Sequence, residues 1–253
     1  MSYTGPQMIT ISLAAEKIFS IGSLAITNSL LLTWLAGIVL IIVALTLVRK
    51  PALIPRGFQN LFEAIVEWVL EMLEPSFGSS EKAEQYFPFI ATFFLFILTA
   101  NWLGVFPFLG ALGFHEMHAG HAIFVPLFRS PASDINFTLA LAIISVLATQ
   151  VFGIVAIGFG KHVGKYLTLK NPIATFVGLL EIISEIAKMI SFSFRLFGNV
   201  FAGEVLLVSI GFLVPYVAPL PFLFLEIFVG LIQALVFAML TTVFLGIAVQ
   251  EQH

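Results

Sequence analysis

Long uncharged apolar runs alternate with short polar segments along most of this chain. Three runs, residues 24–48, 86–112 and 135–160, are long enough to cross the ~30 Å hydrocarbon core of a bilayer as helices that rise ~1.5 Å per residue. Transmembrane β-strands would instead show short segments of alternating polarity. The pattern therefore predicts three ordinary transmembrane helices.

The last third of the chain differs, because its apolar stretches are too long for an upright span. Residues 172–213 and 216–250 are separated by a proline-rich turn, VPYVAPLP. A helix of about 40 residues is ~60 Å long, roughly twice the hydrocarbon thickness. We therefore expect a steeply tilted helical hairpin, or a broken one whose charged N-terminal part lies near the cytoplasmic interface.

Two other segments are amphipathic rather than uniformly apolar. In residues 58–74 the acidic positions recur at helical spacing opposite an apolar stripe, which predicts a helix on the cytoplasmic membrane surface with a solvated acidic face. The acids are Glu63, Glu67, Glu71 and Glu74. The first residues lack the basic region of a cleaved targeting peptide, so none is expected. Residues 8–20 are expected to form a short interfacial helix instead.

Composition strengthens the membrane assignment. Hydrophobic residues make up 60% of the 253 positions, charged residues only 10%, and the mean hydropathy is +1.08. The sequence thus predicts an all-α integral membrane protein with one membrane domain over residues 1–253. The absence of cysteine excludes disulfides and thiolate metal sites, and a net charge of −3 without a basic run argues against a nucleic-acid partner.

The basic residues indicate an orientation in the membrane. They cluster after the first span (Arg49, Lys50, Arg56) and after the third (Lys161, His162, Lys165, Lys170). Residues 115–134, between the second and third spans, hold Arg129 as their only lysine or arginine. Because basic residues are enriched on the cytoplasmic side, we expect the N-terminus outside and the C-terminus in the cytoplasm.

The segment HEMHAGH, residues 115–121, raises the question of a metal. The zinc-protease motif needs a histidine four residues after His115, and the chain has Ala119 there. We expect a solvated loop with no functional metal and no cofactor, although three histidines at intervals of three could bind stray zinc.

Ionisable residues within the long apolar stretch 172–213 are the main functional candidates. Glu181, Lys188 and Arg195 are seven residues apart and share a helix face, which Ser191 and Asn199 adjoin. Glu204 leaves the opposite side of the helix. Such residues usually mark an ion or proton path. The alternatives are an Arg195 held by a partner helix for packing, and interfacial pairing of Lys188 with Glu181 or Glu185.

Three stretches, SFRLFGNVFAGE, GLIQALVFAMLTTVFLGIA and SDINFTLALA, resemble the a subunit of rotary F-type ATP synthases, and the similarity runs in order over most of the chain. The resemblance implies that Arg195 is the essential arginine facing the carboxylates of the c-subunit ring. Asn199, Glu204 and Gln233 also fall on motif positions. At the position seven residues before Gln233 some members carry histidine, and this chain carries Glu226.

The resemblance further implies a proton-translocating stator subunit that forms two aqueous half-channels against the c ring and couples proton flow to ring rotation. Its partners would be the c ring, b-type peripheral stalk subunits and the lipid bilayer of a bacterial inner membrane. The chain has no P-loop, so we expect ATP chemistry to belong to other subunits and this chain to be a non-catalytic channel subunit rather than an enzyme. A self-contained ion-coupled transporter is the alternative, for which inverted repeats would be typical. The choice between proton and sodium stays open.

An antiparallel hairpin with one register would place Glu204 level with Glu226 and Arg195 level with Gln233. We therefore expect Glu204 and Glu226 to form the proton relay of the outer half-channel and to share a proton. The alternative is two separate glutamates, each satisfied by backbone or water. The complete set of expected proton-translocation residues is Ser191, Arg195, Asn199, Glu204, Glu226 and Gln233.

Overall fold

Long helices dominate the computed structural model, which describes residues 15–22, 24–48, 57–118, 121–166, 172–215 and 217–250. Five helices are long and apolar enough to cross a membrane, which confirms the all-α membrane fold. They are α1 (Asn28–Val48), α3 (Ser80–Val105), α5 (Ile135–Ile157), α7 (Pro172–Leu213) and α8 (Pro219–Val249). The basic residues Arg49, Lys50, Arg56 and Lys170 lie outside the described residues.

Local capping explains where these helices begin and end. Helix α3 begins before the predicted residue 86, because the side chain of Ser79 accepts a hydrogen bond from the Lys82 amide as an N-cap. It stops at Val105, and a short helix α4 (Pro107–Gly110) follows. Helix α5 ends at Ile157 and is followed by Gly158, whose φ of 92° favours glycine. The helix after it, α6 (Phe159–Tyr166), was not predicted.

The prediction of an interfacial helix over residues 8–20 is wrong where it can be compared. Strand β1 (Lys17–Ile21) pairs antiparallel with β2 (Leu24–Thr27) around a turn in which Gly22 has a φ of 63°. Helix α1 therefore begins at Asn28 rather than at the predicted residue 24. Residues 8–14 lie outside the described part of the chain.

The histidine-containing segment is a hairpin rather than an irregular loop. Strands β3 (Gly113–His118) and β4 (His121–Pro126) pair antiparallel, with His118 opposite His121. Backbone pairing between the strands replaces the hydration expected of a loop. The prediction that these histidines hold no functional metal stays a prediction.

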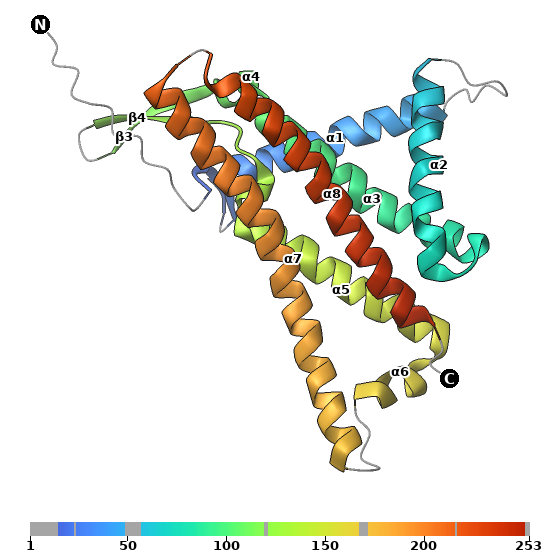
Figure 1. Cartoon of the computed structure of the whole chain (residues 1–253). Helices are drawn as coiled ribbons and strands as arrows, with labels where there is room; N and C mark the ends of the chain where they lie inside the picture. Colours follow the sequence, from blue (N-terminus) through green and yellow to red (C-terminus); the bar gives the residue numbers. More distant parts are fainter. Residues whose placement is uncertain are drawn as a thin grey trace, which may run out of the picture.

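Helix α2 (Phe58–Phe77) is amphipathic, and its acidic residues are exposed. Its apolar face packs against the bundle through the buried side chains of Val69, Leu73 and Phe77, which join the core formed by α3 and α8 (Figure 1). Gly78 caps the C-terminal end of the helix: it has a left-handed φ of 71°, and its amide donates to the Glu74 carbonyl. The acidic face is thus left to solvent or to another chain.

Helices α7 and α8 join at the proline-rich turn and diverge away from it, and the lower part of α5 lies between them (Figure 1). Helix α7 has 42 residues, which corresponds to ~63 Å. Hydroxyl pairs link α5 to both partners: Thr138 to Ser193 at 3.0 Å and Ser145 to Thr241 at 2.9 Å. The tilt of the hairpin against a membrane stays a prediction.

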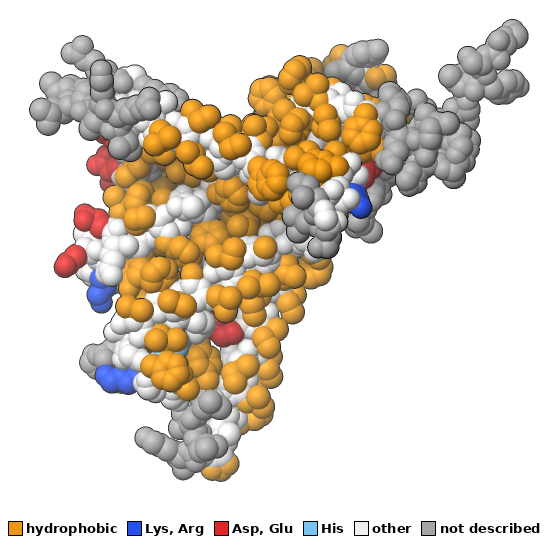
Figure 2. All heavy atoms as spheres, turned by 180° about the vertical axis from the view of Figure 1, so that it is seen from behind, with side chains coloured by type: hydrophobic (Ala, Val, Ile, Leu, Met, Phe, Trp, Pro, Cys, Tyr) orange, Lys and Arg blue, Asp and Glu red, His pale blue; other side chains and the backbone are white. Residues whose placement is uncertain are grey.

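The outer surface of the bundle is apolar over much of its area. Figure 2 shows hydrophobic side chains covering most of one face. Val155 and Ile173 are 77% and 78% exposed. Water would not stabilise so large an apolar surface, so lipid or partner subunits must cover it.

Candidate functional site

Arg195 lies on the side of α7 that the rest of the chain leaves uncovered. Phe192, Leu196 and Val200 are buried in the core on the other side of the helix, whereas Arg195 is exposed. Its Nη2 donates to the Ser191 hydroxyl at 3.4 Å, one turn earlier. No carboxylate of the described residues forms an ion pair with Arg195. A cation on an apolar face without an internal counter-ion is suited to meet an anion of another chain.

A polar contact between α7 and α8 lies one turn beyond Arg195. The side-chain amide of Asn199 donates to Oε1 of Gln233, which is buried. The expected register of the hairpin placed Gln233 level with Arg195. The residue of α7 that bonds Gln233 is Asn199, one turn further along the helix. Since Arg195 and Asn199 are four residues apart on one helix face, the bond places Gln233 near the Arg195 site.

Helix α3 fixes the position of α8 beside this contact. The Asn101 side chain donates to the Gly230 carbonyl at 3.1 Å, and the Trp102 indole donates to the Ile227 carbonyl at 3.1 Å. The Cβ of Asn101 lies only 3.1 Å from where a Cβ of Gly230 would be, so glycine permits this approach. Polar side chains thus join two apolar helices at a defined register.

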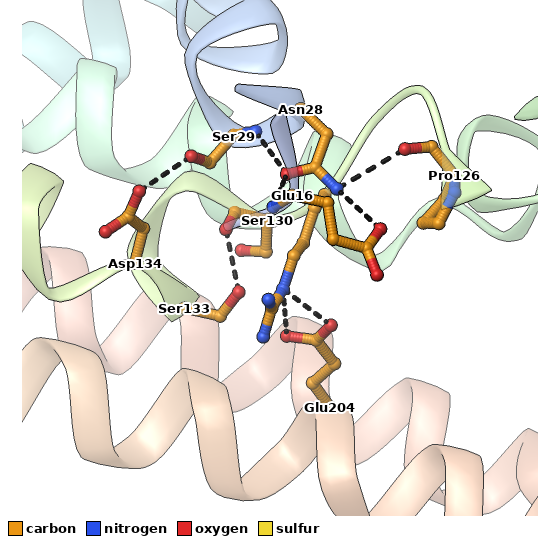
Figure 3. A network of polar contacts seen from close by, with 9 residues as sticks. Glu16, Asn28, Ser29, Pro126, Ser130, Ser133, Asp134 and Glu204 are labelled. Carbon is orange, nitrogen blue, oxygen red and sulfur yellow. Dashed lines mark hydrogen bonds and ion pairs between the residues drawn. The ribbon is translucent and has the colours of Figure 1, made fainter. Parts of the chain in front are cut away.

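Glu204 forms an ion pair that the sequence analysis did not predict. Arg129 Nε donates to Oε1 of Glu204 at 3.1 Å and contacts Oε2 at 3.4 Å. The Arg129 side chain is 7% exposed and that of Glu204 is 30% exposed. Arg129 comes from the segment between β4 and α5, and Figure 3 shows Glu204 rising from α7 toward that segment. The pair therefore links regions 75 residues apart in sequence.

Glu226 lies beside this pair, on α8. It is 9% exposed, and its Oε2 is buried without a hydrogen-bond partner among the residues that the structure describes. The carboxyl group packs on Gly203, where an added Cβ would lie 2.7 Å from Oε1. Because Gly203 directly precedes Glu204 in the sequence, this contact places the Glu226 carboxyl group beside the Glu204 position of α7. The structure thus brings the two expected relay residues together, with Arg129 as a third ionisable group.

A network of polar contacts holds the segment that carries Arg129 (Figure 3). Ser29 donates to Oδ2 of Asp134 at 2.8 Å, and Asp134 Oδ1 accepts the Asn136 amide as the N-cap of α5. On the other side, a Cβ at Gly104 of α3 would lie 2.6 Å from that of Ser130. The segment is therefore packed tightly against α1 and α3, and the guanidinium is positioned by buried contacts.

A separate group of polar contacts involves the N-terminal half of α7. Lys188 Nζ bonds Oε1 of Glu185 at 2.6 Å and lies 4.4 Å from the centroid of the Phe244 ring. Gln150 Oε1 accepts from the Tyr166 hydroxyl at 2.9 Å. Burial, and after it the Glu185 carboxylate, raises the pKa of Tyr166 above its usual value. Lys188 is thus paired within the chain, in contrast to Arg195.

The predicted site residues form two groups in the structure. Ser191 contacts the exposed Arg195, and the Asn199–Gln233 bond lies one turn further along α7; Glu204 and Glu226 lie together nearer the α7–α8 turn. Sequence reasoning missed the roles of Arg129 and Gly203. The only signals were that Arg129 is the one Lys or Arg in residues 115–134, and that a glycine precedes Glu204.

Comparison with known proteins agrees with this arrangement. Residues 30–246 match the family described as ATP synthase A chain. The chain is 37% identical over 221 residues to ATP synthase subunit a of Campylobacter jejuni subsp. jejuni, with coverage of 87% of this chain and 89% of the relative. The same coverage holds for subunit a of Campylobacter fetus subsp. fetus at 34% identity. The chain therefore belongs to the ATP synthase A chain family, the a subunits of F-type ATP synthases.

Proposed function

We propose that this chain is the stator wall against which a c-subunit ring turns in a bacterial inner membrane. Membership of the family makes it a proton-translocating subunit of the membrane sector, separate from the catalytic subunits. The finer proposal is that it forms two aqueous half-channels and couples proton flow to ring rotation, with b-type stalk subunits holding it in place. The N-terminus would face the outside and the C-terminus the cytoplasm.

The observation that carries the proposal is the exposed Arg195 on an apolar helix face. A ring carboxyl must be neutral where it faces lipid, because an ionised one costs several kcal/mol there. Opposite Arg195 it can ionise, since a guanidinium stays charged and surrenders no proton. The same fixed charge opposes direct proton leakage between the half-channels.

The polar groups beside Arg195 support this role. The Ser191 hydroxyl accepts from the guanidinium, and Asn199 and Gln233 provide neighbouring amides. Glu204 and Glu226 lie nearer the α7–α8 turn, which the proposed topology places outside, so they would line the outer half-channel. A membrane potential contributes ~2.3 kcal/mol per charge per 100 mV to the transfer.

Substitution Arg195→Ala tests the proposal. We expect it to abolish ATP-driven proton pumping in membrane vesicles while the subunit still copurifies with the ring, because an exposed side chain contributes little to folding. Glu63→Gln, on the exposed face of α2, is the control and should pump normally. Coupled pumping at near-normal rates in Arg195→Ala contradicts the mechanism. Proton flux through the chain reconstituted alone would favour the self-contained transporter.

A further inference from the structure

The outer group contains two carboxyl groups and one guanidinium, and the three are not equivalent. Arg129 Nε contacts both oxygens of Glu204, at 3.1 and 3.4 Å. Glu226 has no ion pair among the described residues, and its Oε2 is buried without a hydrogen-bond partner there. The geometry therefore separates the two glutamates, which the sequence alone left interchangeable.

The charge of Arg129 decides which glutamate is ionised. A guanidinium remains protonated in proteins, so a buried one requires an anion beside it. Glu204 supplies that anion, and a second negative charge on the adjacent Glu226 would be opposed both by burial and by like-charge repulsion. One proton on Glu226 leaves the three groups with zero net charge and gives its carboxyl group a hydrogen to donate.

The other ionisable groups on the elements around the outer group are either bonded to other partners or further along the chain. Helix α5 has none, and Glu226 is the only one on α8. Asp134, the nearest acid on the segment of Arg129, is occupied by Ser29 and by the cap of α5. The Glu16 carboxylate, which belongs to the same polar network (Figure 3), accepts from the Asn28 side chain at 3.4 Å. On α7 the other ionisable residues are Glu181, Glu185, Lys188 and Arg195, which precede Glu204 by nine residues or more. Arg129 is thus the counter-ion available to the outer group.

We propose that Arg129 holds Glu204 as a permanent anion, so that Glu226 alone is the carboxyl that carries the proton through the outer half-channel. The inference rests on the proposed function. An O–H bond forms on Glu226 with a proton from outside water and breaks when the proton passes to an ionised ring carboxylate, while Arg129 and Glu204 keep their charges. Glu204 and Arg129 are then positioning residues.

The test compares Arg129→Gln, Glu204→Gln and the double variant that carries both changes. Arg129→Gln leaves Glu204 uncompensated beside Glu226, and Glu204→Gln leaves Arg129 to draw a negative charge onto Glu226. Each single change should slow passive proton flux roughly tenfold or more, because it removes one member of the buried Arg129–Glu204 ion pair. The double variant removes both charges beside Glu226, so it should conduct protons at least about fivefold faster than either single variant. Such non-additivity is typical of directly coupled residues.

Flux is measured in vesicles stripped of the catalytic subunits and divided by the amount of subunit that copurifies with the ring. This normalisation separates slow conduction from poor assembly, which is the effect that a merely structural ion pair would produce. Glu226→Gln alone should stop the proton flux of the unmodified subunit. Added to the double variant, it should stop the flux that the double variant recovers. Glu63→Gln serves as the surface control for the glutamate exchange.

Two results separate this inference from the function on which it rests. If the double variant is as slow as Glu204→Gln while Arg195→Ala still abolishes pumping, Glu204 itself carries the proton and the inference is overturned. Recovered flux that survives the added Glu226→Gln change overturns it as well. Normal pumping in Arg195→Ala contradicts the proposed function instead, whatever the double variant does.

Discussion

Arg195 on α7 and Arg129, which contacts α7, both carry a guanidinium group, but the surroundings of the two groups differ. Arg129 is 8% exposed and pairs with Glu204 of the same chain. Arg195 is exposed, and its side-chain partner is the uncharged hydroxyl of Ser191. One charge is satisfied inside the subunit, and the other lies where an anion from outside the subunit can reach it.

The difference shows how one residue type can serve two purposes in a membrane protein. A buried pair fixes two charges in place, because separating them would leave either one uncompensated in a poorly solvated site. An arginine without an internal anion keeps its electrostatic attraction available for a carboxylate that arrives and departs. Whether the counter-ion lies inside or outside the subunit therefore decides whether an arginine fixes another side chain in place or interacts with a carboxylate of another chain.

Exchange of each arginine for lysine sharpens this comparison and has the largest expected effect. Arg195→Lys should reduce ATP-driven pumping on the order of a hundredfold, about 2.7 kcal/mol, because an ammonium lacks the planar fork and can lose its proton when desolvated. Arg129→Lys should reduce it only about threefold, since the charge beside Glu204 remains. Pumping rates per assembled complex check both values, and equal losses at the two positions contradict the assigned roles.

Glu226 provides the next largest effect. Glu226→Leu removes the titratable group and should lower passive proton flux by about tenfold or more, whereas Glu226→His keeps a group that can bind and release a proton and should be tolerated better. Flux through membranes that contain the ring, at matched subunit amounts, is the measurement. Unchanged flux in Glu226→Leu would remove Glu226 from the proton path.

The smallest effect is expected at the glycine that supports Glu226. A methyl group at Gly203 would lie 2.7 Å from Oε1 of Glu226, so Gly203→Ala must displace the carboxyl group and should slow proton flux about threefold. Gly211→Ala on the same helix is the matched control, because its Cβ would meet only Pro219 Cγ at 3.9 Å. Assembly should be preserved in both. Equal flux in the two variants would show that the contact at Gly203 is unimportant.

Sequence reasoning succeeded where a single helix carries the information. The lengths of the apolar runs predicted five long membrane helices, and helical periodicity placed Arg195, Ser191 and Asn199 on neighbouring positions. It failed in short segments such as Lys17–Ile21, where strand pairing depends on a partner across a turn. The hairpin at Gly113–Pro126 was missed for the same reason.

The sequence by itself determined that this protein is a helical membrane protein, to which family it belongs, and which residues of α7 and α8 to consider. These properties follow from local apolarity and motif spacing, which no distant contact alters. Only the tertiary structure decided that Arg129 pairs with Glu204 and that Glu226 lies unpaired against Gly203. Such pairings depend on how α5, α7 and α8 pack, and side chains 75 residues apart have no local signal that records their contact.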